Sequence, residues 1–166
     1  IAYCVGSINI KPLNLTKDDD FIDSFKINTL GAINIIKINA EYLSKNKGSI
    51  LLFSTIAVKQ GFTNHTVIST AKGAIEGLTL SLAAEFAPKI RINCIAPSLT
   101  DSKMTQKLIK NENIRNAIEN MHPLQKIGSG DDFSDIGYYL LSEKNSWITG
   151  QIFHIDGGRS TLRIKS

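Results

Sequence analysis

The sequence has few of the features that point to a metal site, a disulfide framework or a membrane. It contains only two cysteines, Cys4 and Cys94, which stand in apolar stretches without metal-ligand spacing to a histidine. We therefore expect two buried free thiols in a reducing compartment, and no metal site. No apolar run approaches the roughly 20 residues that a membrane-spanning helix needs. We expect no signal peptide, no membrane partner and a cytoplasmic location.

The sequence also lacks clusters of charge of one sign. The formal net charge is +4, but the lysines and arginines are scattered along the chain. A nucleic-acid surface would need them on one face, so we expect no nucleic-acid partner. The 42% hydrophobic content allows a buried core, and 166 residues suit one domain. We therefore expect residues 1–166 to form a single domain.

Short apolar stretches alternate with longer segments of helical periodicity. The expected strands are residues 1–5, 49–53, 90–96 and 150–156, and the main expected helices are residues 16–43, 67–86 and 131–142. This alternation predicts an α/β fold, with an open parallel sheet covered by helices on both faces. Ligands of such a sheet bind beyond the carboxyl ends of its strands.

Local signals refine these elements. Thr16 is followed by a lysine and three aspartates, which predicts a helix N-cap with acids in the first turn. Gly31 indicates a bend within the long helical segment. The small residues of segment 67–86 favour close packing against the sheet. The polar, weakly amphipathic segment 101–120 predicts a lid over a cleft.

Several spaced motifs together resemble the short-chain dehydrogenase/reductase family, from the fourth strand of its fold onward. They are Gly6, Asn28-Thr29-Leu30-Gly31, Gly48-Ser49-Ile50, Ser54-Thr55, Lys72, Arg91-Ile92-Asn93, Pro97, Ile148-Thr149-Gly150-Gln151 and Asp156-Gly157-Gly158. The resemblance implies a Rossmann-like sheet that lacks the first strands of the dinucleotide-binding half. It also implies NAD or NADP as cofactor and a small carbonyl or alcohol as substrate.

In this family the glycine-rich turn that binds the pyrophosphate lies before the segment matched here. We therefore expect these residues to be the remainder of a longer polypeptide. Without neighbouring strands, segment 1–5 would form an exposed apolar edge.

The resemblance also assigns roles to individual residues. Asn28 would support a proton-relaying water, and Thr55, with Ser54 beside it, would orient the substrate carbonyl. Lys72 would hold the nicotinamide ribose and lower the pKa of a neighbouring acid. The family's catalytic tyrosine falls on Ile68, which has no proton to donate. His65 occupies the tyrosine position of a related enoyl-reductase branch, although a loop histidine is more often simply solvated.

Further positions would contact the cofactor, and some residues have alternative interpretations. The resemblance places Gly6, Lys72, Pro97, Ser98, Leu99 and Ser102 at the nicotinamide end. Without a cofactor, Lys72 would reach solvent. Asn28 could instead bond to the backbone where its helix bends, and Thr55 could cap a loop.

Two functions from different classes follow. The first is a nicotinamide-dependent oxidoreductase whose activity is impaired by the absent tyrosine. The alternative is a non-catalytic relative that serves as a binding or oligomerisation module. In both cases we expect a homo-oligomer that associates through the long helices at 16–43 and 67–86.

Overall fold

A computed structural model describes residues 1–164 and contains a parallel sheet. Its strands are β1 (Ser49–Phe53), β2 (Arg91–Pro97) and β3 (Ile152–Ile155), in the order β1-β2-β3. Leu51 lies opposite Asn93, and Cys94 lies opposite Ile152. The expected open parallel sheet is confirmed, with three of the expected strands assigned in the described part of the chain.

The first segment of the chain differs from its expected form. Instead of a strand over residues 1–5, a single parallel bridge joins Ala2 to Leu51. The Tyr3 N–H donates to the Leu51 carbonyl at 2.9 Å. The chain then leaves β1 to approach α3, so Val5 is 58% exposed and Cys4 is exposed rather than buried. The expectation of two buried thiols is therefore correct for Cys94 and wrong for Cys4.

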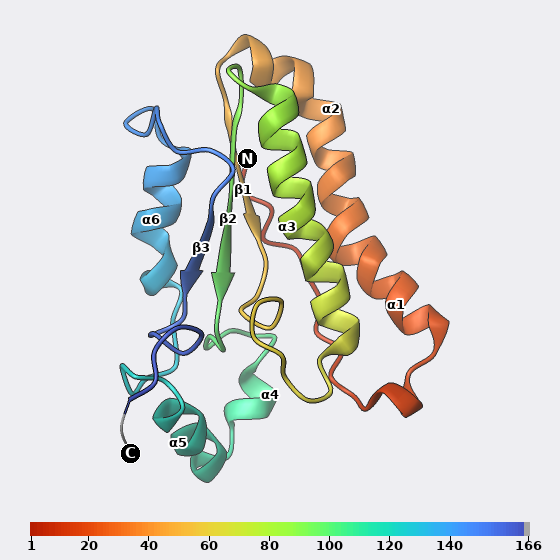
Figure 1. Ribbon diagram of the computed structural model, residues 1–166, viewed down its shortest axis with the longest axis vertical. Coiled ribbons are helices and arrows are strands. Elements are labelled where there is room, and N and C mark those ends of the chain that lie inside the picture. Colours follow the sequence, from red (N-terminus) through yellow and green to blue (C-terminus); the bar gives the residue numbers. More distant parts are fainter. Residues whose placement is uncertain (165–166) are drawn as a thin grey trace.

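Helices cover both faces of the sheet (Figure 1). On one face lie α1 (Asp18–Phe25), α2 (Gly31–Lys45) and α3 (Thr66–Phe86), and on the other lies α6 (Asp131–Leu141). Because successive strand residues point to opposite faces, Ile50 and Leu52 join the core beneath α2 and α3. Leu51 joins the core with Leu140 of α6.

The long helical segment is interrupted by a π-helix over Lys26–Leu30. The bend is thus a widened turn that ends just before Gly31, whose own backbone is regular helix. A Cβ on Gly31 would lie 2.1 Å from the Tyr3 hydroxyl, which donates to the Ile27 carbonyl at 2.7 Å. The glycine is therefore explained by the close approach of Tyr3 and not by the bend.

The expected N-cap at Thr16 is wrong by one residue. The helix begins at Asp18, and Lys17 occupies the N-cap position. The Thr16 hydroxyl donates to the Leu13 carbonyl at 2.7 Å, which closes the short 3-10 turn Leu13–Leu15. The carboxylate of Asp20 reaches back to the Lys17 N–H at 2.7 Å. An aspartate at the third helical position therefore accepts from the N–H of the N-cap residue, as in a capping box, and Thr16 takes no part in the cap.

The segment expected to form a lid contains two short helices, α4 (Gln106–Ile109) and α5 (Glu112–Asn120). The Asn111 side chain caps α5 by accepting from the Asn113 N–H at 2.9 Å. Both helices lie beyond the carboxyl ends of the strands (Figure 1). Across the described residues, no helix combines the length and the apolar character needed to cross a membrane.

Candidate active site

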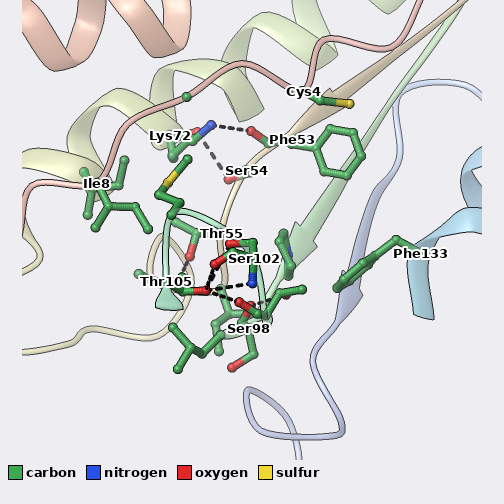
Figure 2. Close-up of a pocket in the computed structure, with 18 of the residues that line it drawn as sticks. Cys4, Ile8, Phe53, Ser54, Thr55, Lys72, Ser98, Ser102, Thr105 and Phe133 are labelled. Atoms are coloured by element: carbon green, nitrogen blue, oxygen red, sulfur yellow. Dashed lines mark hydrogen bonds between the residues drawn. The ribbon is translucent and has the colours of Figure 1, made fainter. Parts of the chain in front are cut away.

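A cavity of about 970 Å³ is lined in part by Ser54, Thr55, Ser98 and Leu99, which follow the carboxyl ends of β1 and β2, where an open parallel sheet binds its ligands. It also extends along β1 to Leu51 and the N-terminal segment. Residues of the N-terminal segment, of α3, of the α4 and α5 region and of α6 line it. Figure 2 shows Lys72, Ser54 and Thr55 near one another, with Ser98 and Ser102 further along the same space. All of the residues expected at the site border this cavity: Gly6, Asn28, Thr55, Ile68, Lys72, Pro97, Ser98, Leu99 and Ser102. Their chemical roles stay predictions.

Lys72 extends from α3 toward the end of β1 (Figure 2). Its Nζ donates a 2.9 Å hydrogen bond to the carbonyl oxygen of Phe53, the last residue of β1. Burial lowers the pKa of the Lys72 ammonium from its ordinary value, because desolvation disfavours the charged form. The side chain is therefore anchored in the cavity wall and does not extend freely into solvent.

Asn28 is placed by the π-helix and is fully buried. Its Nδ2 donates to the Ser24 carbonyl at 2.9 Å and to the Ser7 hydroxyl at 3.2 Å. Its Oδ1 accepts from the Ser7 N–H at 3.3 Å. The alternative interpretation of an asparagine bonded to backbone at a helix irregularity is thus confirmed. A role toward a ligand is compatible with it, because Asn28 also borders the cavity.

Gly6 brings the N-terminal segment against both of these side chains. A Cβ at this position would lie 2.9 Å from the Asn28 Oδ1 and 3.5 Å from the Lys72 Nζ. The space beside the amide and the ammonium therefore exists only because residue 6 has no side chain. This cradle fits the nicotinamide ribose that the family resemblance implies, since an ammonium and an amide can both bond to hydroxyl groups.

The two hydroxyl groups at the end of β1 are engaged differently. Ser54 is buried and its Oγ donates to the Glu76 carboxylate at 2.6 Å, so its proton is committed to the protein. Thr55 Oγ1 accepts from the Ala57 N–H at 3.3 Å. Within residues 1–164, no acceptor is found for the Thr55 hydroxyl proton. Thr55 is therefore the hydroxyl that can donate to a ligand carbonyl.

Ile68 stands one helical turn before Lys72, at the cavity wall. It is 5% exposed, and its hydrocarbon side chain can neither donate nor accept a proton. His65, at the N-cap of α3, also borders the cavity. Its Nδ1 lies 2.8 Å from the Thr63 carbonyl oxygen, and its ring meets the Phe62 ring edge-on at 5.4 Å between centroids. The structure thus brings His65 to the cavity but does not assign it a chemical role.

Ser98, just beyond the end of β2, takes part in a chain of hydrogen bonds. The His122 Nδ1 lies 2.7 Å from the Ile118 carbonyl oxygen and must donate to it. The neutral ring then accepts at Nε2 from the Ser98 hydroxyl, at 2.7 Å. Burial lowers the pKa of His122, and the charge of Arg159 lowers it further, which favours this neutral form. The chain ties the end of β2 to the segment that follows α5.

Ser102 and the helices α4 and α5 line another side of the cavity. The Ser102 N–H and hydroxyl both meet the Thr105 Oγ1, at 3.1 and 3.0 Å, as Figure 2 shows. This local network fixes the turn that precedes α4. Apolar side chains of the same segment also line the cavity, namely Met104, Leu108, Ile114 and Ile118.

Three residues of this region were missed from the sequence. Glu76 lies one turn beyond Lys72 on the same helix face, and this spacing could have identified it. Arg159 directly follows the Asp156-Gly157-Gly158 motif and borders the cavity. His122 gave no local signal, because its partners Ser98 and Ile118 are set by the fold.

Comparisons with known proteins agree with this architecture. Residues 1–160 match a protein family described as enoyl-(acyl carrier protein) reductase. The chain is 33% identical to tropinone reductase-like 3 of Erythroxylum coca over 134 residues, covering 81% of this chain and 52% of that protein. It is 34% identical over 159 residues to the peroxisomal 2,4-dienoyl-CoA reductase SPS19 of Saccharomyces cerevisiae, covering 95% and 54%. The chain belongs to the short-chain dehydrogenase/reductase family.

Solved structures show the same fold. The structure titled ElxO with NADP bound superposes with a TM-score of 0.89 at 33% identity, covering 97% of this chain and 66% of that one. The ligand-free aldohexose dehydrogenase of Thermoplasma acidophilum gives a TM-score of 0.92 at 23% identity, covering 99% and 69%, and supports the fold alone. The chain spans about half the length of the curated relatives it matches.

Proposed function

We propose that residues 1–166 are the substrate-side part of a nicotinamide-dependent oxidoreductase that acts on a small carbonyl or alcohol. The observation that carries this proposal is the cluster of Gly6, Asn28, Thr55 and Lys72 at one cavity beyond the strand ends. The solved relative with NADP bound supports NAD or NADP as the cofactor. We also propose that the residues form one partial domain, and that its free thiols suit the reducing cytoplasm.

Each side chain would contribute a separate interaction. A bound nicotinamide supplies or accepts the hydride. Lys72 would hold the ribose hydroxyls near the end of β1, and Thr55 would donate its unused proton to the substrate oxygen. Asn28 would support a water beside Lys72. Ile68 leaves no proton donor at the family position, and a positioned acid typically contributes about 10²–10⁴ in rate. We therefore expect weak turnover.

Titration of the full polypeptide with NADH and NADPH tests the cofactor assignment. We expect binding of at least one nucleotide, and a loss of roughly tenfold in affinity in Lys72→Met, because a charge-assisted hydrogen bond is removed. Lys59→Met is the matched control, since Lys59 is exposed and lies outside the cavity lining. Failure of both nucleotides to bind the wild-type protein would contradict the oxidoreductase proposal.

A separate observation supports the proposed homo-oligomer, which is expected both for an oxidoreductase and for the alternative, a non-catalytic oligomerisation module. Large apolar side chains are exposed on α1, the π-helix, α2 and α3: Ile22, Phe25, Ile27, Leu30, Ile35, Ile38, Tyr42 and Leu80. Exposed apolar surface of this kind is typical of a protein interface. Sedimentation of wild-type and Ile38→Glu protein tests it, since Ile38 is 78% exposed. We expect an oligomer that the charge dissociates, whereas a monomeric wild-type protein would rule out homo-oligomerisation.

A further inference from the structure

Arg159 places a guanidinium in the wall of the candidate active-site cavity. Its Cζ lies 4.7 Å from the centroid of the Phe62 ring, a cation–π geometry. Its Nη1 donates to the Ser98 hydroxyl oxygen at 3.4 Å, and its Nη2 contacts the Met121 sulfur at 3.5 Å. Three separate segments of the chain therefore hold the side chain in one orientation.

The charge of this guanidinium is only weakly compensated. Among residues 1–164, no carboxylate oxygen lies within 4.0 Å of the Arg159 guanidinium nitrogens. Asp156 is close in sequence, but its two oxygens accept from the backbone N–H groups of Gly158 and Ser160, both at 2.9 Å. A guanidinium has five N–H donors, and the acceptors seen here are one hydroxyl and one thioether.

The hydrogen bond between Ser98 and His122 supports the orientation of Arg159. The Ser98 hydroxyl gives its proton to the His122 Nε2, at 2.7 Å, and so keeps a lone pair for the Arg159 Nη1. Burial lowers the pKa of Arg159, and the charge of Asp156 opposes that shift. An arginine is effectively always protonated in proteins. A fixed cation with spare donors thus borders the same cavity as Thr55 and Lys72.

The side of the cavity formed by α4 and α5 is mostly hydrocarbon. Leu108, Ile114 and Ile118 of the α4 and α5 segment line it, with Phe62 and Ile68 from the neighbouring loop and helix. Such a lining suits an apolar molecule, and a single half-buried guanidinium suits one anionic group on it.

We propose that Arg159 binds the anionic end of the substrate, which is a compound with an apolar body and a terminal carboxylate or phosphate. This inference rests on the proposed oxidoreductase function, because it assigns the substrate class of that site. The guanidinium would fix the far end of the molecule, while Thr55 receives the reacting oxygen. A carboxylate and a phosphate each present two neighbouring oxygens that a guanidinium can bind with two parallel hydrogen bonds.

A binding titration with the full polypeptide tests the proposal. Octanoate and octyl phosphate are the anionic probes, and octanamide is the neutral probe with the same chain length. We expect at least one anion to bind roughly tenfold or more tightly than octanamide, and Arg159→Gln to abolish this preference without changing the affinity for octanamide. Arg163→Gln is the matched control, because Arg163 is exposed and lies outside the cavity lining.

The outcomes separate the possibilities. Tighter binding of octanoate assigns a carboxylate substrate, and tighter binding of octyl phosphate assigns a phosphate. Equal binding of all three probes, no binding of any probe, or a preference that survives Arg159→Gln overturns the proposal. Should Arg159→Gln fail to fold, Arg159→Lys decides, since loss of the bidentate fork must weaken the preference.

Titration of NADH and NADPH into the same samples distinguishes this proposal from the wider one. Nucleotide binding without an anion preference refutes the role of Arg159 alone. An Arg159-dependent anion preference without nucleotide binding refutes the oxidoreductase function and leaves an anion-binding cavity.

Discussion

Replacing Ile68 with tyrosine tests how the cavity would perform proton transfer. The substitution places a phenol one helical turn before Lys72, whose Nζ is fixed on the Phe53 carbonyl at 2.9 Å. A neighbouring ammonium lowers the pKa of a phenol, because it stabilises the phenolate. If Lys72 and Thr55 act as proposed, Ile68→Tyr supplies the proton donor that the wild-type chain lacks.

The substitution should lower the stability of the protein slightly and raise its turnover. Ile68 is only 5% exposed, and enlarging a buried side chain typically costs about 1–3 kcal/mol of stability. The side chain borders a cavity of about 970 Å³, so the ring has space and we expect a cost near the lower limit. A positioned acid typically gives about 10²–10⁴ in rate, or roughly 3–5 kcal/mol of the activation barrier. A loss near 1 kcal/mol is small beside a typical stability of about 5–15 kcal/mol, so the variant should stay folded and the gain in turnover should be measurable.

The assay compares Ile68→Tyr with Ile68→Phe, which has the same ring without the hydroxyl. We would measure kcat/KM for a panel of small ketones and aldehydes by the oxidation of NADH and NADPH, and melting temperature as the check on folding. Ile68→Tyr should exceed both Ile68→Phe and the wild type by roughly two orders of magnitude or more. Equal rates for the tyrosine and phenylalanine variants would show that no proton transfer takes place from this position.

Three further predictions concern packing, substrate orientation and pH. Gly6→Ala should lower the free energy of unfolding by about 1–3 kcal/mol and weaken nucleotide binding, because the added Cβ would lie 2.9 Å from the Asn28 Oδ1. Gly61→Ala is the control: no atom lies within 4 Å of the added Cβ, so neither quantity should change. Thr55→Val should lower kcat/KM roughly tenfold with little change in melting temperature, and a large loss of stability would instead indicate a structural hydroxyl. The pKa of His122 is lower in the folded protein than its usual 6.5, so the unfolded chain binds more protons and stability should fall as pH drops below about 6.5. We would measure the free energy of unfolding by chemical denaturation at several pH values across this range. The free energy should depend less steeply on pH in His122→Gln than in the wild type, and equal dependence would show that His122 does not cause the effect.

The sheet and its main helices could be predicted because their signals are local. The apolar stretch Ser49–Phe53 and the helix Thr66–Phe86 lie within a residue of their expected bounds. The family motifs likewise placed Lys72 and Thr55, since both positions follow from spacing along one strand and one helix. Such features depend on periodicity, which sequence carries directly.

The parts that failed depend on contacts between distant segments. Cys4 stands in an apolar stretch, yet it is exposed because its segment leaves β1 after one bridge. The apolar pattern of residues 1–5 is typical of a buried strand. It does not show whether other strands or helices cover this segment. Arg159 and His122 meet through Ser98, from positions far apart in the chain. No local pattern encodes a hydrogen-bond chain of this kind.

The π-helix at Lys26–Leu30 makes the site sensitive to chain length as well as to side-chain identity. The buried positions Ser24, Asn28, Ala32 and Ile36 recur every four residues, and each such step overshoots a regular helical turn by about 40°. The widened turn absorbs part of that drift and keeps Asn28 facing inward. In a regular helix the three steps from Ser24 to Ile36 would accumulate about 120° of drift, and these positions would not share one buried face. The number of residues in the π-helical turn therefore sets the phase of the helix. This phase determines whether the Asn28 amide reaches the cavity.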